Sequence, residues 1–188
     1  MMRPTLVIFA KAPRLGRVKS RLARDIGASA ALGFYRQMLR RVLGRIGRDR
    51  RWHTILAVTP DSSSRVARLW PARCSRQGQG VGDLGARMGR VLRMRRRGPI
   101  AIVGTDIPDL EAAHIATAFR RLGDADAVFG PAGDGGYWLV GWRRGPCPSR
   151  LFAHVRWSSD RALADTLANL RGRRVRLLDR LDDVAVAV

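Results

Sequence analysis

Residues 6–22 read LVIFAKAPRLGRVKSRL, and this stretch decides both the fold and the chemistry expected of the chain. The apolar run from Leu6 to Ala10 is typical of a buried strand. A basic, glycine-containing loop follows. Its turn residues are Pro13 and Gly16, and its spaced cations are Lys11, Lys19 and Arg21. Such a loop between a strand and a helix commonly holds phosphates, because backbone N–H groups and the positive helix end face the anion. The loop therefore predicts phosphate binding, and the alternative is a solvated surface loop.

The spacing in this loop excludes the familiar nucleotide motifs. A Walker A loop needs G-x-x-x-x-G-K-[ST], whereas here Gly16 lies three residues before Lys19 and position 11 is a lysine. The dinucleotide pattern G-x-G-x-x-G is absent as well. No nucleophile elbow or Ser-His-Asp order is present, so hydrolysis through a covalent serine is unsupported.

Periodicity predicts alternating strands and helices along the chain. Strands are expected at 5–10, 53–59, 99–104, 125–129, 137–142 and 175–178. Helices are expected after Gly27 and at 64–70, 84–97, 111–122 and about 158–171, with residues 77–85 as a polar, glycine-dense loop. Strands that alternate with helices indicate an α/β fold with a mostly parallel sheet. The turn that joins 125–129 to 137–142 predicts one antiparallel strand.

Two helix starts carry candidate caps. Asp109 is placed to cap the helix from Glu111, and Ser158 or Ser159 to cap the helix that runs to about Arg171.

Length and composition predict a single domain over residues 1–188. No run of about 18 apolar residues could span a membrane, and Lys11 ends an apolar run too short for a signal peptide. Cys74 and Cys147 are far apart and lack metal or redox spacing. We expect a cytoplasmic protein with reduced thiols.

The chain carries a net charge of +21, and Lys11 and Lys19 are its only lysines. One interpretation is a basic nucleic-acid-binding protein without catalysis. The other is genome composition, which we favour because the arginines are scattered, with one tight run at Arg95–Arg97 and no interleaved aromatic residues. The charge still suits a small polyanionic substrate such as a nucleotide.

Polar residues follow the expected strands and should converge. The first strand ends at Lys11, the second near Asp61 and the third at Thr105-Asp106. Because ligands bind at the carboxyl ends of the strands in such sheets, these residues predict a site at one edge.

Two aspartates, Asp106 and Asp134, are candidates for metal binding or catalysis. Asp106 directly follows an apolar strand and is a good ligand for Mg²⁺ or Mn²⁺, although a capping role is the alternative. Asp134 lies among glycines that permit close ligand approach, or simply in a tight hairpin turn. The histidines share no metal-binding spacing, and the tryptophans suit the core or a pocket wall.

Five segments together resemble a known family. They are FAKAPRLGRVKSRLA, QGQGVGDLGARM, VGTDIPDL, GPAGDGGYWLVG and WSSDRALADT. Their order resembles the bacterial DUF2064 family of glycosyltransferase-like proteins, from about Leu6 to Leu181, some of which are linked by name to arsenosugar biosynthesis. The resemblance implies a three-layer α/β/α fold with a mixed, mostly parallel sheet, the Rossmann-like GT-A nucleotide-diphospho-sugar transferase fold.

The KSRL segment also resembles phospholactate guanylyltransferases, and the strand–Asp layout is similar to molybdenum-cofactor guanylyltransferases. These resemblances imply that the first loop binds phosphate through Lys11, Arg14, Gly16, Lys19 and Arg21. They also imply that Asp106 holds Mg²⁺ or Mn²⁺ and that Asp134 faces the acceptor or the metal as a catalytic residue.

The chain departs from the family pattern at two places. An Asp-x-Asp pair is common in GT-A enzymes, but Pro108 occupies its second position here. The family's D-[VI]-D tail has Ala185 in place of its second aspartate. We expect a metal-dependent transferase that uses a nucleotide sugar and a small-molecule acceptor. The alternative is a nucleotidyltransferase that uses a nucleoside triphosphate and releases pyrophosphate.

Overall fold

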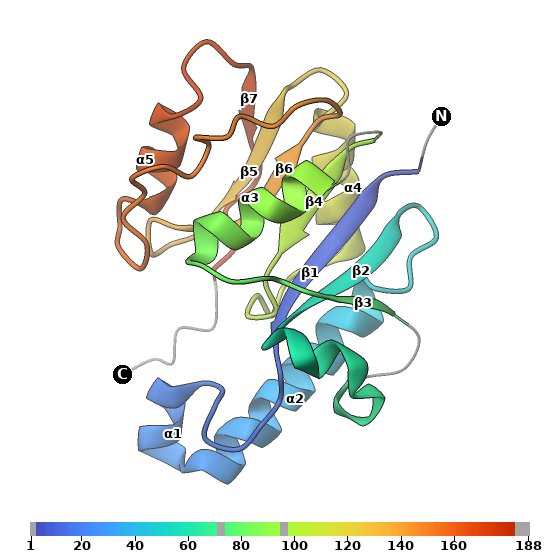
Figure 1. Ribbon diagram of the computed structural model, residues 1–188, viewed down its shortest axis with the longest axis vertical. Coiled ribbons are helices and arrows are strands. Elements are labelled where there is room, and N and C mark those ends of the chain that lie inside the picture. Colours follow the sequence, from blue (N-terminus) through green and yellow to red (C-terminus); the bar gives the residue numbers. More distant parts are fainter. Residues whose placement is uncertain (1–2, 71–73, 95–97, 183–188) are drawn as a thin grey trace.

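The computed structural model describes residues 3–70, 74–94 and 98–182, and a seven-stranded sheet organises them (Figure 1). The strands are β1 (Thr5–Lys11), β2 (His53–Thr59), β3 (Ser75–Gly78), β4 (Ile100–Val103), β5 (Ala127–Pro131), β6 (Tyr137–Trp142) and β7 (Val175–Leu177). Their order across the sheet is β3-β2-β1-β4-β6-β5-β7. Strand β1 therefore lies inside the sheet, with parallel neighbours on both sides.

The sheet is mixed and mostly parallel, as predicted. Strand β6 is antiparallel to both β4 and β5, while β2–β3 and β5–β7 are parallel pairs. The hairpin predicted between β5 and β6 is thus confirmed. Strand β3 was missed because its sequence, SRQG, has no apolar residue to show a strand period.

Helices cover both faces of the sheet. They are α1 (Ser20–Ile26), α2 (Ala28–Arg45), α3 (Leu84–Met94), α4 (Ala112–Arg121) and α5 (Ala162–Ala168). Leu6 and Ile8 face one core with α2 and α4, whereas Val7 faces a second core with α3. Leu163 and Leu167 of α5 pack on that second core. The predicted three-layer α/β/α arrangement is confirmed, and Figure 1 shows α3 crossing in front of the strands.

Both predicted helix caps were wrong. Helix α4 begins after Glu111, whose N–H donates to His114 Nδ1 at 3.1 Å, so Asp109 lies outside the cap in the preceding turn. Helix α5 begins only at Ala162, and its N-cap residue Arg161 makes no side-chain cap. Ser159 instead closes a turn, donating from Oγ to the Arg156 carbonyl at 2.7 Å.

Other boundaries differ more modestly. The segment expected as a helix at 64–70 forms two 3₁₀ turns, Asp61–Arg65 and Ala67–Leu69.

Arg95–Arg97 and Ala185, both singled out in the sequence, lie outside the described residues. Among the residues described, no helix combines the length and the apolar character needed to cross a membrane.

Candidate active site

An ion pair joins the first loop to the end of β4. Lys19 Nζ lies 3.1 Å from Asp106 Oδ1, and the exposed fractions of the two side chains are 16% and 47%. The sheet explains why they meet, because β1 and β4 are parallel neighbours whose carboxyl ends lie at one edge. The predicted convergence therefore brings a phosphate-loop lysine onto the candidate metal ligand.

One carboxylate oxygen of Asp106 makes no hydrogen bond among the described residues. Oδ1 is buried and has no hydrogen-bond partner among the described residues, so Lys19 acts on it as a nearby charge rather than through an aligned hydrogen bond. A buried carboxylate oxygen without a partner is costly. It fits a ligand that completes its coordination.

The backbone of the loop turns sharply on both sides of Val18. Gly16 has φ +68 and Lys19 has φ +47, both in the left-handed region. For a lysine this conformation costs roughly 1–2 kcal/mol. Lys19 adopts it at the N-cap of α1, where the turn sends its side chain to Asp106 instead of to solvent.

Tyr35 of α2 fixes the end of β1. Its hydroxyl donates to the Lys11 carbonyl and accepts from the Lys11 N–H, both at 2.8 Å. Burial raises the pKa of Tyr35 to about 12, and the charge of Asp106 adds to this. The phenol is neutral and holds the strand end in place. The sequence placed Tyr35 only on an apolar helix face.

The glycine-dense loop after β3 is pinned to the same edge. Buried Gln79 donates from Nε2 to the carbonyls of Ala57 at 2.9 Å and Ala10 at 3.3 Å. Both carboxylate oxygens of Asp61 accept the Gly80 N–H, at 3.0 and 3.1 Å. Asp61, one of the polar residues expected at the edge, is thus engaged in positioning this loop.

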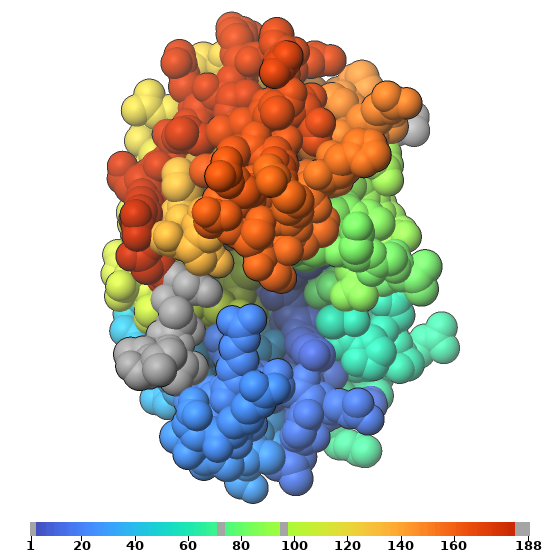
Figure 2. Space-filling model, turned by 90° about the vertical axis from the view of Figure 1, so that its left-hand side faces the viewer, coloured from blue at the N-terminus to red at the C-terminus, as the bar shows by residue number. Residues whose placement is uncertain are grey.

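A cavity of about 450 Å³ opens beside the ion pair and is called here the carboxyl-edge cavity. Asp106 and Asp134 both line it, from different loops. Its apolar wall includes Phe9, Met88, Tyr137 and Trp157. Figure 2 shows the surface hollowed between the N-terminal segment (blue) and the segment around residues 145–160 (orange).

Asp134 lies in the β5–β6 turn, where its Oδ1 accepts the Gly136 N–H at 2.8 Å. Gly135 has φ +80, and a Cβ there would overlap the backbone of Asp160. The Leu163 N–H donates to the Gly135 carbonyl at 3.0 Å. The GDGG turn and the WSSD segment, distant in sequence, therefore form one wall.

Trp157 links that wall to the glycine-dense loop. Its ring centroid lies 6.4 Å from Tyr137 and 6.0 Å from Phe152. A Cβ on Gly85 would lie 2.8 Å from Trp157 Cζ2, so the indole can pack there only against a glycine. The motif glycines thus allow three segments to close around the cavity.

The remaining predicted phosphate ligands lie in the same segment as Lys19 and form no ion pair with Asp106 among the described residues. Lys11, Arg14, Gly16 and Arg21 are exposed, and no ion pair of theirs exists among the described residues. Their exposure leaves them available to an anion, and their roles stay predictions.

The donor set suits a cation only together with a substrate. Within residues 3–70, 74–94 and 98–182, no three His, Cys, Asp or Glu side chains cluster to hold an ion by themselves. Mg²⁺ and Mn²⁺ commonly take one or two protein carboxylates plus substrate phosphates. Asp106 Oδ1, which has the Lys19 charge nearby but no hydrogen-bond partner among the described residues, fits that pattern.

Residues 42–159 match the sequence profile of a family described as an uncharacterized protein conserved in bacteria, DUF2064. No curated protein matches the sequence.

Solved structures match the fold. A protein from Desulfovibrio desulfuricans G20, described as a candidate nucleotide-diphospho-sugar transferase, is 28% identical with a TM-score of 0.87, over 98% of this chain and 83% of that one. CMP:2-keto-3-deoxy-manno-octonic acid synthetase, complexed with CTP, has a TM-score of 0.57 at 9% identity, over 96% and 91% of the two chains. A manganese complex from Mycobacterium tuberculosis H37Rv has a TM-score of 0.53 at 16% identity, over 99% and 93%. The nucleotide-diphospho-sugar transferase fold expected from the sequence is confirmed.

Proposed function

This chain belongs to the DUF2064 family, and from that premise we propose that it is a metal-dependent transferase that uses a nucleotide sugar. The observation that carries the proposal is the Lys19–Asp106 ion pair, whose carboxylate oxygen Oδ1 has no hydrogen-bond partner among the described residues, with Asp106 lining the carboxyl-edge cavity. The similarity to the Desulfovibrio protein supports a nucleotide-sugar donor.

The first loop binds the diphosphate of the donor. Lys19 lies closest to the carboxylate, and the exposed Lys11, Arg14 and Arg21 add positive charge around it. Gly16 lets the backbone approach the phosphates without a side chain in the way. Each well-placed cation stabilises the departing diphosphate by roughly 2–4 kcal/mol, because negative charge grows there in the transition state.

Asp106 is the protein ligand for Mg²⁺ or Mn²⁺, and such an ion supplies further positive charge to the diphosphate when it is bound. Asp134 serves the acceptor side of the cavity. As the acceptor hydroxyl attacks the sugar carbon and the bond to the diphosphate breaks, the Asp134 carboxylate takes the hydroxyl proton. A role as second metal ligand is the alternative for Asp134.

Nucleotidyl transfer is the second candidate. The fold is shared with a synthetase solved with CTP, and the same loop could hold a triphosphate. In that reaction the acceptor attacks the α-phosphorus and pyrophosphate leaves. The two candidates therefore differ in the bond that breaks and in the product that is released.

A two-stage experiment tests the proposal. The first stage is a thermal-shift screen of nucleotides and nucleotide sugars with and without Mn²⁺, since binding to the folded state raises the melting temperature. We expect nucleotide sugars to stabilise the protein only with the ion. The second stage incubates labelled nucleotide sugars and triphosphates with the protein. Pyrophosphate release would favour nucleotidyl transfer, and the absence of any nucleotide shift would contradict both candidates.

A further inference from the structure

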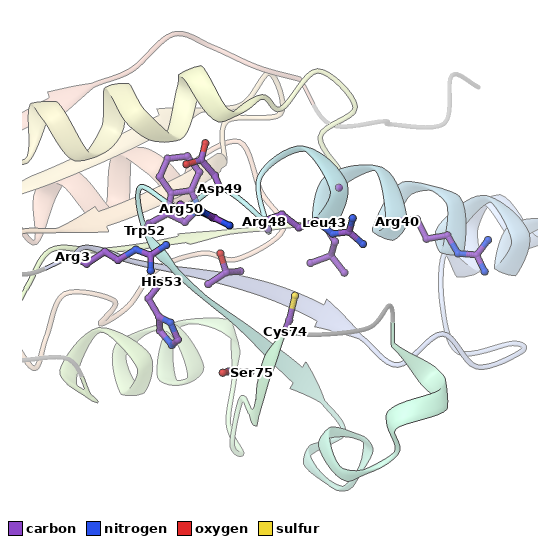
Figure 3. Close-up of a pocket in the computed structure, with 13 residues that line it drawn as sticks. Arg3, Arg40, Leu43, Arg48, Asp49, Arg50, Trp52, His53, Cys74 and Ser75 are labelled. Carbon is purple, nitrogen blue, oxygen red and sulfur yellow. The ribbon is translucent and has the colours of Figure 1, made fainter.

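A second hollow lies at the opposite edge of the sheet, where β1, β2 and β3 begin (Figure 3). It has a volume of about 860 Å³ and is called here the amino-edge recess. Among the described residues, four arginines line it: Arg3 before β1, Arg40 on α2, and Arg48 and Arg50 between α2 and β2. At about 3.3 Å per residue, the length of β1 separates this recess from the Lys19 site by roughly 20 Å.

The positive charge of the recess is only partly compensated. Within the described part of the chain, none of the four guanidinium groups forms an ion pair or a hydrogen bond. Asp49 is the only acidic residue among the described residues of the lining, and another arginine, Arg51, already binds its carboxylate at 2.6–3.1 Å. That pairing lowers the pKa of Asp49, and the nearby charge of Arg3 adds to this, so the carboxylate stays ionised with Arg51 as its hydrogen-bonded partner.

Two arginines close to the recess do have structural partners. Arg45, on the same helix as Arg40, donates from Nη1 to the Pro108 carbonyl at 2.7 Å. Arg51 stacks over the Trp52 ring, with Cζ 5.0 Å from the centroid. These two arginines have structural partners, whereas those of the recess have none among the described residues.

The base of the recess adds polar atoms that could contact a ligand. Thr54 Oγ1 is buried and has no hydrogen-bond partner in the described residues. Cys74 lies half-buried near Arg48, and Figure 3 draws its sulfur pointing to the side of Leu43 and Arg48. The Trp52 ring is buried, so it offers no free face for stacking a nucleobase.

We propose that the amino-edge recess binds a small molecule that carries two or more phosphate groups. Guanidinium groups contact phosphate oxygens in pairs through planar N–H donors, and four of them from three segments would hold more than one phosphate. The volume lies in the range of small-molecule sites. Charge, rather than a base or a sugar ring, is what this lining recognises. The site does not depend on the reaction at the carboxyl edge.

Inorganic tripolyphosphate is the probe for this site, measured by calorimetry on the whole chain without divalent ions. A Lys19→Ala background removes a principal anion contact of the first loop, and binding should persist in it. Adding Arg48→Gln and Arg50→Gln should then weaken the affinity at least tenfold. The matched control, Arg41→Gln with Arg121→Gln, removes the same charge from exposed positions outside the recess and should change the affinity less than threefold.

Three results would overturn the proposal. Loss of all tripolyphosphate binding in Lys19→Ala alone would assign the anion to the carboxyl edge. If the control pair weakened tripolyphosphate binding equally, the effect would come from net charge and not from the recess. A 20-nucleotide single strand that binds more tightly than tripolyphosphate, and whose binding Arg48→Gln with Arg50→Gln weakens, would make the recess a nucleic-acid surface.

A measurement on the unmodified protein guards against misfolded variants. Cys74 lines the recess and is half-buried, whereas Cys147 is buried. Tripolyphosphate should slow alkylation of Cys74 by iodoacetamide severalfold, as read by peptide mass spectrometry. An unchanged rate at saturating tripolyphosphate would contradict binding in the recess.

Discussion

The two edges of the sheet use positive charge in opposite ways. At the carboxyl edge, Lys19 already faces a carboxylate at 3.1 Å, and Asp134 lines the same cavity. At the amino edge, four arginines line a hollow whose single acid is bound by Arg51. The net charge of +21 is therefore a background from which neither site could be identified. The two edges differ in whether a carboxylate faces the cations, and the net charge does not show this difference.

Residue type separates the edges as well. Both lysines of the chain flank the first loop, while every other Lys or Arg position is arginine. A lysine ammonium is a compact point charge, whereas a guanidinium is a planar fork that binds phosphates in pairs. The first loop thus combines both lysines with arginines such as Arg14 and Arg21, whereas the cations that line the amino-edge recess are all arginines among the described residues.

Glycines at the two edges should respond oppositely to the same substitution. Gly135→Ala should destabilise the fold by about 3 kcal/mol, because φ is +80 and the new Cβ would overlap the Asp160 backbone. Gly44→Ala, in the α2 segment that lines the amino-edge recess, should stabilise it by about 0.5–1 kcal/mol, since nothing lies within 4 Å. Urea denaturation measures both, and equal signs would contradict the packing described for the GDGG turn.

Removing the first-loop lysine should weaken nucleotide binding without unfolding the protein. Lys19→Ala should lower the affinity for the best ligand of the screen about 100-fold, the range for losing one well-placed charge. Arg24→Ala, exposed on α1, is the matched control and should change it less than threefold. Similar losses in both variants, by calorimetry, would mean that the loop acts only through net charge.

The Tyr35 clamp should be visible in stability. Tyr35→Phe leaves the Lys11 N–H and carbonyl without their partner and should cost about 1–3 kcal/mol near pH 8. The pKa of Tyr35 is raised from 10.0 to about 12, so the folded state holds its proton while the unfolded state loses it. Stability should therefore fall between pH 10 and 12, and this tyrosine-dependent part should vanish in the variant. An identical alkaline profile in both proteins would exclude the clamp as its source.

The smallest effect is expected at the Arg51–Asp49 pair of the amino edge, in which the arginine side chain is 55% exposed. Arg51→Gln breaks the contact with Asp49 on the surface, where solvent screens it. The melting temperature at neutral pH should stay within experimental error of the unmodified protein. A large drop would show that this loop, rather than the recess arginines, organises the edge.

The sequence predicted much of this fold because its strands are strongly apolar and its helices periodic. It also predicted that Lys19 and Asp106 would share an edge, since parallel strands align their carboxyl ends. It could not predict their contact, which depends on the left-handed backbone at Lys19. Gln79 and Tyr35 were missed for a related reason, because their roles come from partners far away in the chain.

The amino-edge recess could not be read from the sequence at all. Its lining joins Arg3, the Arg48–Arg50 segment and Cys74. These three parts are tens of residues apart and come together only through the parallel pairing of β1, β2 and β3. In a chain with scattered arginines, no local pattern marks these few.

Calorimetry of Asp106→Asn tests the central claim, that the carboxyl edge is a nucleotide–metal site, most directly. The asparagine keeps the shape of the side chain and removes the charge that would hold the ion. We expect the unmodified protein to bind the best nucleotide of the screen more tightly with Mn²⁺ than without it, and the variant to lose that metal-dependent gain. Unchanged, metal-dependent binding by Asp106→Asn would contradict the assignment of this edge.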